Sequence, residues 1–242
     1  MKQALRAPAV PLIACDPYFS VWSFSDRLYD DDTRHWTGRR KAMKGILRVD
    51  GRDYRFMGSG NGATANQKSV EITPTSSVYT FEAGGMELEV KFTTPLLLDD
   101  LELTSRPCSY VLVSVCSPDG KAHQASLLWE VDAELCYHAE NSREDRPEDR
   151  ATENTGGKGQ IRGRDEGRPE IFGGTHHRDG IKTAWMGRAR QGILSHSGDD
   201  ITIDWGYAYL AVPKGEGTRV FFTDGGGRDG ETDPDGEIDS KD

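Results

Sequence analysis

Polar and apolar residues alternate along several short stretches of this chain, and turn-forming residues separate the stretches. The alternation is clearest from Met86 to Phe92, where every second residue is apolar, as expected of a strand with one buried face. Paired glycines or an Asp-Gly dipeptide join neighbouring stretches, and both tolerate the positive φ angles of a tight hairpin turn. Two hairpins are therefore predicted, 45–49 with 52–57 around Asp50-Gly51, and 77–83 with 86–93 around Gly84-Gly85.

Further strands are predicted beyond these hairpins. Residues 109–116 and 123–132 are predicted to form a third pair around a turn at Pro118-Asp119-Gly120. No stretch has the periodicity of an amphipathic helix. Many short strands without alternating helices predict an all-β fold, a large antiparallel β-sandwich. Later strands are expected at 181–188, 201–205, 207–212 and 218–222.

Two segments have a composition that differs from the strands. Residues 137–169 are rich in Glu, Asp, Arg and Gly, with too few apolar residues to offset the entropy cost of ordering. We expect a long, flexible, charged insert there, and a disordered acidic tail at 224–242. The remaining organisation is predicted as an N-terminal module at 1–60, packed on a sandwich that spans 61–223.

Charge and cysteine content limit the classes of partner. The chain of 242 residues carries 40 acidic and 30 basic residues, a net charge of −10, which disfavours nucleic acid and anionic membrane surfaces. No apolar run is long enough for a membrane helix, and residues 1–12 have no apolar core of a signal peptide. None of the four cysteines has the spacing of a zinc site. Buried free thiols are the favoured interpretation, with a Cys116–Cys136 disulfide left open.

Other motifs do not indicate catalysis, a cofactor or a metal. The glycine-rich residues 58–63 follow a predicted strand, but no helix pattern follows to receive a phosphate, so we expect a flexible loop. The acidic residues 231–242 resemble a calcium loop with several ligand positions changed, and His176-His177 has no third ligand at a suitable spacing. No serine or cysteine has a nucleophile signature. We therefore predict no metal and no cofactor.

One aromatic and charged segment, residues 16–38, is the best candidate for binding. It combines tryptophans with carboxylates, a histidine and an arginine, a mixture suited to a polar cleft with stacking walls. The alternative is that these aromatic residues belong to the core or to a contact between domains, since large rings are mostly buried for packing. The candidate ligand-binding or interdomain residues are Trp22, Asp26, Arg34, His35 and Trp36.

In the same segment the sequence resembles the N-terminal region of the glutaminase A family. The order in which the matching motifs occur makes the resemblance specific. It covers residues 5–223 in patches and is weak across the charged insert. It implies a short module leading into a large β-sandwich. The matching motifs are Leu5–Leu12, Asp16–Ser23, Thr33–Gly38, Arg48–Gly51, Tyr54–Gly58, Leu98–Pro107 and Asp204–Tyr207.

The family resemblance also implies a function. In the family a separate α-helical toroid follows the sandwich, and the activity is hydrolysis of glutamine to glutamate and ammonia. We expect that helical catalytic domain to be absent from this chain and to be its partner, with secreted or periplasmic localisation. The charged insert and the acidic end of the chain depart from the family pattern. No catalytic residue of the family matches a position here.

Three functional interpretations remain from the sequence. The first is a non-catalytic accessory sandwich of a glutaminase A-like hydrolase. The second is a stand-alone module that binds a carbohydrate, a peptide or another small molecule through its aromatic residues. The third is a fragment without retained function.

Overall fold

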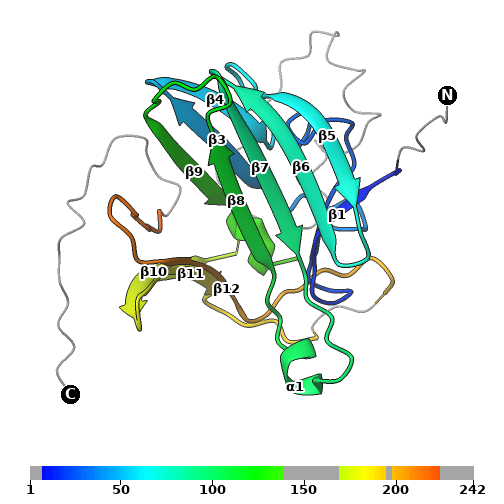
Figure 1. Ribbon diagram of the computed structural model, residues 1–242. Helices are drawn as coiled ribbons and strands as arrows, with labels where there is room; N and C mark the ends of the chain where they lie inside the picture. Colours follow the sequence, from blue (N-terminus) through cyan, green and yellow to red (C-terminus); the bar gives the residue numbers. More distant parts are fainter. Residues whose placement is uncertain (1–6, 139–168, 195–197, 224–242) are drawn as a thin grey trace, which may run out of the picture.

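The computed structural model describes residues 7–138, 169–194 and 198–223. Regular structure in these residues is nearly all β, which confirms the predicted fold class (Figure 1). The predicted charged insert and acidic tail fall largely on residues 139–168 and 224–242, outside the described residues. The elements are β1 (Val10–Ala14), β2 (Ser20–Ser23), β3 (Met43–Val49), β4 (Arg52–Met57), β5 (Asn66–Ile72), β6 (Ser76–Ala83), β7 (Met86–Thr93), α1 (Leu101–Thr104), β8 (Tyr110–Cys116), β9 (Ala125–Val131), the 3-10 helix η1 (Ala133–Cys136), β10 (Ile171–Arg178), β11 (Ile181–Arg188) and β12 (Tyr207–Pro213).

Two antiparallel sheets, in the strand orders β5-β6-β7-β8 and β4-β3-β9, pack face to face through aromatic side chains. The ring of Phe56 on β4 lies 5.7 Å from Phe81 on β6 and 6.1 Å from Trp129 on β9, between ring centroids. Trp129 in turn lies 5.9 Å from Phe92 on β7. A Cβ atom on Gly45 would overlap the Phe56 ring, so the glycine lets this ring lie directly against β3. These contacts define the core of a β-sandwich.

Both predicted hairpins are confirmed. Asp50 and Gly51 have φ angles of 49° and 80°, and Val49 is opposite Arg52 across the turn. Gly84 and Gly85 have φ angles of 60° and 85° between β6 and β7. Positive φ at both central residues is the type I′ geometry that matches the twist of paired strands.

The third predicted pair is wrong in its pairing, although both strands exist. β8 pairs with β7, and β9 pairs with β3, so the connection at 117–124 crosses from one sheet to the other. It is longer than a two-residue turn and does not impose a hairpin register. Polar contacts hold the crossover, because His123 lies between Asp50 at 2.6 Å and Asp119 at 3.0 Å. Gln124 also donates its backbone N–H to Asp50.

A third antiparallel sheet, β10-β11-β12, lies beside the sandwich (Figure 1). Met186 of this sheet packs with Leu135 and Cys136 of η1 in a second buried cluster. β11 and β12 confirm two predicted strands. The strands predicted at 201–205 and 218–222 are not formed.

The backbone of residues 201–205 makes hydrogen bonds to loops instead of a neighbouring strand. Ile203 donates to the carbonyl of Tyr18, and the Asp204 carbonyl accepts from Gly192. In the segment 218–222, Thr218 donates to Gly215 within its own turn. Tertiary contacts therefore replace the ladder that the apolar pattern predicted.

The four cysteines are free thiols, and the Cys116–Cys136 disulfide is not formed. Cys136 is buried and Cys15 is half-buried, but Cys108 and Cys116 are exposed, so the prediction of burial is wrong for these two. Burial raises the pKa of the Cys15 and Cys136 thiols, which keeps them protonated near neutral pH. Among the described residues, no helix is long and apolar enough to span a membrane.

Replacing the central ring of the core tests this packing. Phe56→Ala should lower the free energy of unfolding, measured by urea titration, by about 3–5 kcal/mol, because it removes a fully buried ring and leaves a cavity. The matched control is Phe24→Ala, since Phe24 is 40% exposed and should contribute a small fraction of that energy. Equal losses for the two variants would contradict the assignment of Phe56 to the core.

Candidate functional site

Three loops that are far apart in the sequence meet at one end of the sandwich. We call them the loop cluster, residues 15–19, 33–39 and 198–205. The Pro17 carbonyl accepts hydrogen bonds from the side chains of His35 at 2.9 Å and Trp36 at 2.8 Å. Ile203 donates its N–H to the Tyr18 carbonyl at 2.8 Å, and Arg39 forms an ion pair with Asp200 at 2.7 Å. The stretches Asp16–Ser23, Thr33–Gly38 and Asp204–Tyr207 that carry the family resemblance thus meet in space.

The loop cluster presents exposed aromatic rings. Trp36 is 46% exposed and Tyr18 is 41% exposed, although hydrogen bonds fix the backbone or side chain of both. The Tyr18 ring lies 5.7 Å from the ring of Trp205, tilted by 58°. Fixed and exposed aromatic rings are typical of contact surfaces, because they bring apolar area at a low cost in conformational entropy.

His35 lies beneath these rings and is fully buried. A carbonyl only accepts hydrogen bonds, so Nε2 carries the proton that Pro17 receives, and Nδ1 accepts from the Thr37 hydroxyl at 2.9 Å. Burial lowers the pKa of His35 to about 4, with a further contribution from the charges of Lys41 and Arg39. The imidazole is therefore neutral near pH 7 and acts as a structural link between two loops.

The other predicted site residues lie around the cluster. Trp22 and Arg34 exchange backbone hydrogen bonds of 2.7 and 2.9 Å, and the Trp22 indole donates to the Ser20 hydroxyl. The Arg34 side chain binds Asp31 at 3.2 Å. Asp26 is exposed in the turn after β2, where its carbonyl accepts from Gln67 of β5. The structure thus brings His35 and Trp36 together on Pro17, whereas the side chains of Trp22 and Arg34 bind other partners.

Sequence reasoning missed four residues of the cluster. Tyr18 and Trp205 could have been found from the sequence, because each belongs to a motif of the family resemblance. Arg39 and Asp200 had no such signal, since nothing in the sequence predicts a contact between charged residues so far apart. Their ion pair joins two of the three loops.

A buried lysine anchors the segment after the cluster to the 3-10 helix η1. Lys41 is 2% exposed, and its ammonium donates to the carbonyls of Glu134 and Tyr137 around η1. Burial lowers the pKa of Lys41 to about 8, and the Glu134 carboxylate opposes this shift. Arg40 binds Asp32 and Glu134, each at 2.7 Å. All of these contacts are satisfied within the chain, which indicates a structural role.

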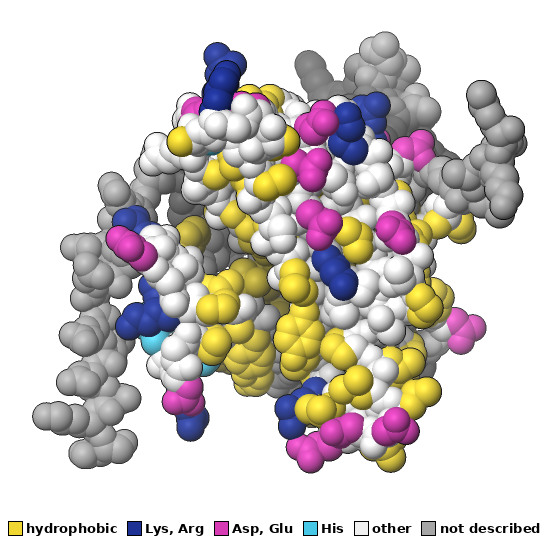
Figure 2. Space-filling view, in the orientation of Figure 1, with side chains coloured by type: hydrophobic (Ala, Val, Ile, Leu, Met, Phe, Trp, Pro, Cys, Tyr) yellow, Lys and Arg dark blue, Asp and Glu magenta, His cyan; other side chains and the backbone are white. Residues whose placement is uncertain are grey.

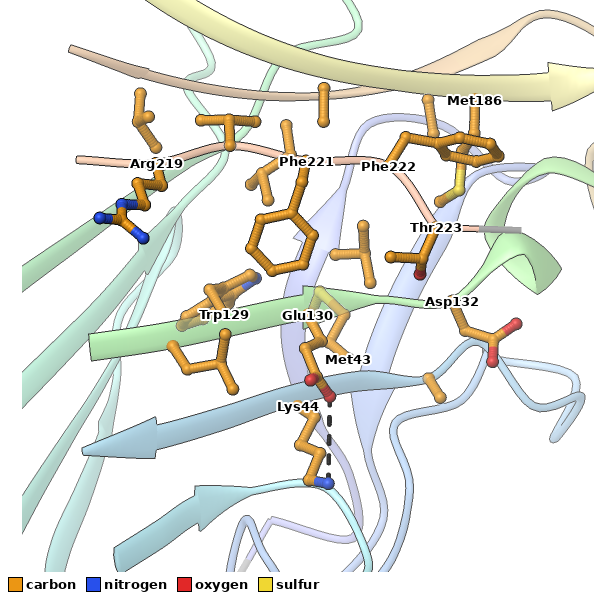
Figure 3. Close-up of a pocket in the computed structure, with 18 of the residues that line it drawn as sticks. Met43, Lys44, Trp129, Glu130, Asp132, Met186, Arg219, Phe221, Phe222 and Thr223 are labelled. Atoms are coloured by element: carbon orange, nitrogen blue, oxygen red, sulfur yellow. Dashed lines mark ion pairs between the residues drawn. The ribbon is translucent and has the colours of Figure 1, made fainter. Parts of the chain in front are cut away.

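A groove with a volume of about 1580 Å³ lies between β9 and residues 216–223 (Figure 3). In Figure 3 the Phe221 ring points toward Trp129 across it, and the Lys44–Glu130 ion pair, 3.9 Å long, lies at its edge. Met186 and Phe222 add further apolar lining. The groove combines this apolar area with charged side chains such as Arg40, Asp132 and Arg219, a mixture that suits binding of a ligand or a chain segment.

The remaining motifs of the sequence have structural explanations where they are described. The residues of the glycine-rich stretch 58–63 precede strand β5, not a helix, and the buried Arg55 donates to the carbonyls of Gly58 and Gly60. His176 and His177 are neighbours on β10, so their side chains point to opposite faces. Within the described residues, no three His, Cys, Asp or Glu side chains are grouped to hold a metal ion. The calcium-like residues 231–242 lie outside the described residues.

Two family models match this chain, and both are described as domains of unknown function. DUF4964 matches residues 1–64, and DUF5127 matches residues 75–152.

The chain is similar to glutaminase A of Aspergillus oryzae (strain ATCC 42149 / RIB 40), with 39% identity over 138 residues. The match covers 53% of this chain and 20% of that protein, so the chain spans about one fifth of the length of the curated relative it matches. No solved structure matches the chain. The predicted resemblance to the glutaminase A family is confirmed.

The buried neutral histidine makes stability depend on pH. In the unfolded chain His35 takes up a proton below about pH 6.5, whereas in the folded chain it does so only near pH 4. Its contribution is therefore complete above pH 6.5 and declines as the pH falls, by roughly 3 kcal/mol in total. His35→Gln should be less stable than the wild type at pH 7, and the difference should shrink toward pH 4. Urea titrations at several pH values measure this, and parallel pH profiles would contradict the neutral assignment.

Proposed function

We propose that this chain is a non-catalytic β-sandwich portion of a glutaminase A-like hydrolase, which braces or completes a helical catalytic domain. The parent activity is then hydrolysis of L-glutamine to L-glutamate and ammonia, outside the cytoplasm. Support comes from the identity with glutaminase A, which falls on a fifth of that protein. A portion of that size is consistent with a supporting domain.

The observation that carries this proposal is the state of the loop cluster. Its polar side chains are occupied by hydrogen bonds that join loops, as His35 and Trp36 do at Pro17. Its large exposed apolar side chains are the rings of Tyr18 and Trp36. Side chains that are committed to structure and rings that are open to solvent fit a contact with another domain better than a reaction centre.

An assay of the isolated chain tests the non-catalytic part of the proposal. Purified protein incubated with L-glutamine should release no ammonia above the level of a heat-denatured sample. Turnover that scales with protein concentration and disappears on denaturation would overturn it.

A chimera tests the supporting role. The 138 matched residues of the Aspergillus oryzae glutaminase A are replaced by the corresponding residues of this chain, and glutaminase activity and thermal stability are measured. We expect an active chimera in which Trp36→Ala lowers activity or stability, while Val70→Ala on the solvent-exposed strand β5 does not. A chimera that tolerates both changes equally would contradict a contact at the loop cluster.

A second candidate function is binding of a carbohydrate, for which aromatic rings of the third sheet give specific support. Phe172, Trp185 and Tyr207 lie edge to face with centroid distances of 5.4–5.8 Å on one face of the sheet. Tyr209, beside Trp185 in the register, is 61% exposed. Apolar faces of sugars stack on such rings.

Tryptophan fluorescence separates this candidate from the first. If the chain binds sugars through its aromatic rings, a panel of glycans should produce a saturable change in tryptophan fluorescence. If the third sheet is the binding surface, Tyr209→Ala should abolish that change. Trp36→Ala, at the loop cluster, serves as the matched control. A flat response across the panel would count against carbohydrate binding.

A further inference from the structure

In the part of the chain that the structure describes, one edge of a sandwich sheet lacks the usual protection against pairing with another strand. β8 is the last strand of its sheet and has the sequence YVLVSVC, with no charge, proline or glycine. Tyr110 and Leu112 are 58% and 55% exposed on its outer face. Figure 2 shows hydrophobic side chains gathered on the face that Figure 1 locates at β8 and β9. A long apolar edge strand is a template for strand addition.

The opposite edge of the same sheet is protected. β5 has the sequence NQKSVEI, with Lys68 and Glu71 on the strand and an irregularity in pairing between Gln67 and Ser69. Lys68 forms an ion pair with Glu82 at 3.1 Å. Charges and bulges on edge strands are the usual devices against association. The contrast between the two edges indicates that one faces solvent and the other is covered.

The side of the sandwich next to β8 also leaves its core open. Val111 and Val115 lie on the inner face of β8, opposite the buried Phe92 and Leu88, yet they are 37% and 39% exposed. Leu127 has the equivalent place on β9, the edge strand of the other sheet, and is 41% exposed. Edge residues that point toward the core and remain exposed need a cover on this side.

We propose that a second copy of this chain covers this side, with β8 paired antiparallel to β8 of the second copy around a two-fold axis. The two four-stranded sheets then form one sheet of eight strands (4 + 4). An isologous contact must be self-complementary, and a strand without charges meets its own copy without repulsion. On the neighbouring β9, Glu130 is paired with Lys44 at 3.9 Å. Glu87 and Glu89 of β7 lie opposite Cys116 and Ser114, so these acidic groups are one strand away from the pairing edge.

Sedimentation velocity of the complete chain, with a reductant because Cys108 and Cys116 are exposed, tests the proposal. The wild type should sediment as a dimer of twice 26.8 kDa at micromolar concentrations. Leu112→Lys places a charge in the pairing edge and should weaken dimerisation by at least about tenfold. The matched control, Val70→Lys, changes a 39% exposed residue on the protected edge and should leave the dimer unchanged.

A second variant guards against loss of folding. Ser114 lies on the outer face of β8 opposite Glu89, so Ser114→Lys gains an ion-pair partner within its own sheet and still adds charge to the edge. Folded Ser114→Lys, checked by circular dichroism, should also be monomeric. A monomeric wild type at all concentrations, or a dimer that the β8 variants leave intact, would overturn the proposal. The proposal would also be overturned if Val70→Lys dissociated the dimer to the same extent as the β8 variants.

Discussion

Packing of aromatic rings between the two sheets is the interaction on which the rest of this structure depends. Phe56 contacts rings from both sheets, and Gly45 leaves the room it needs. This contact fixes the β3–β4 hairpin on the β6–β7 hairpin. The N-terminal segment then packs on the same core through Val10, Leu12, Val21 and Leu28. Because that segment is anchored by its apolar residues, its loops are held where they meet residues 198–205 and form the loop cluster.

Local sequence patterns predicted many of the strands and both hairpins, but they did not predict which strands pair when these are far apart in the sequence. The hairpins at Asp50-Gly51 and Gly84-Gly85 followed from turn chemistry that acts between neighbouring residues. The partners of β8 and β9 did not, because a crossover between sheets is decided by which inner faces pack together. Strand β5 was missed because its residues are polar and solvent-exposed. The short strands β1 and β2 and strand β10, with its adjacent glycines, also escaped prediction.

The candidate site was predictable in part for the same reason. Trp36 and His35 were candidates because their segment combines aromatic and charged residues, and the family motifs identified the same region. The sequence could not distinguish a catalytic histidine from a buried structural one, since that depends on the Pro17 carbonyl and Thr37 hydroxyl that the fold brings to the ring. The described surface thus favours contact over chemistry. Two of its regions, the loop cluster and the β8 edge, expose apolar side chains where other proteins usually bury such groups or carry charged residues instead.

Hydrogen–deuterium exchange of the complete chain tests most directly whether one side of the sandwich is built for contact. Peptides covering β8 and β5 come from the two edge strands of one sheet, so each has half of its backbone groups without a partner in that sheet. We expect slow exchange throughout β8, more so at higher protein concentration, and fast exchange at the outward amides of β5 at every concentration. Equally fast exchange in both strands, independent of concentration, would contradict it.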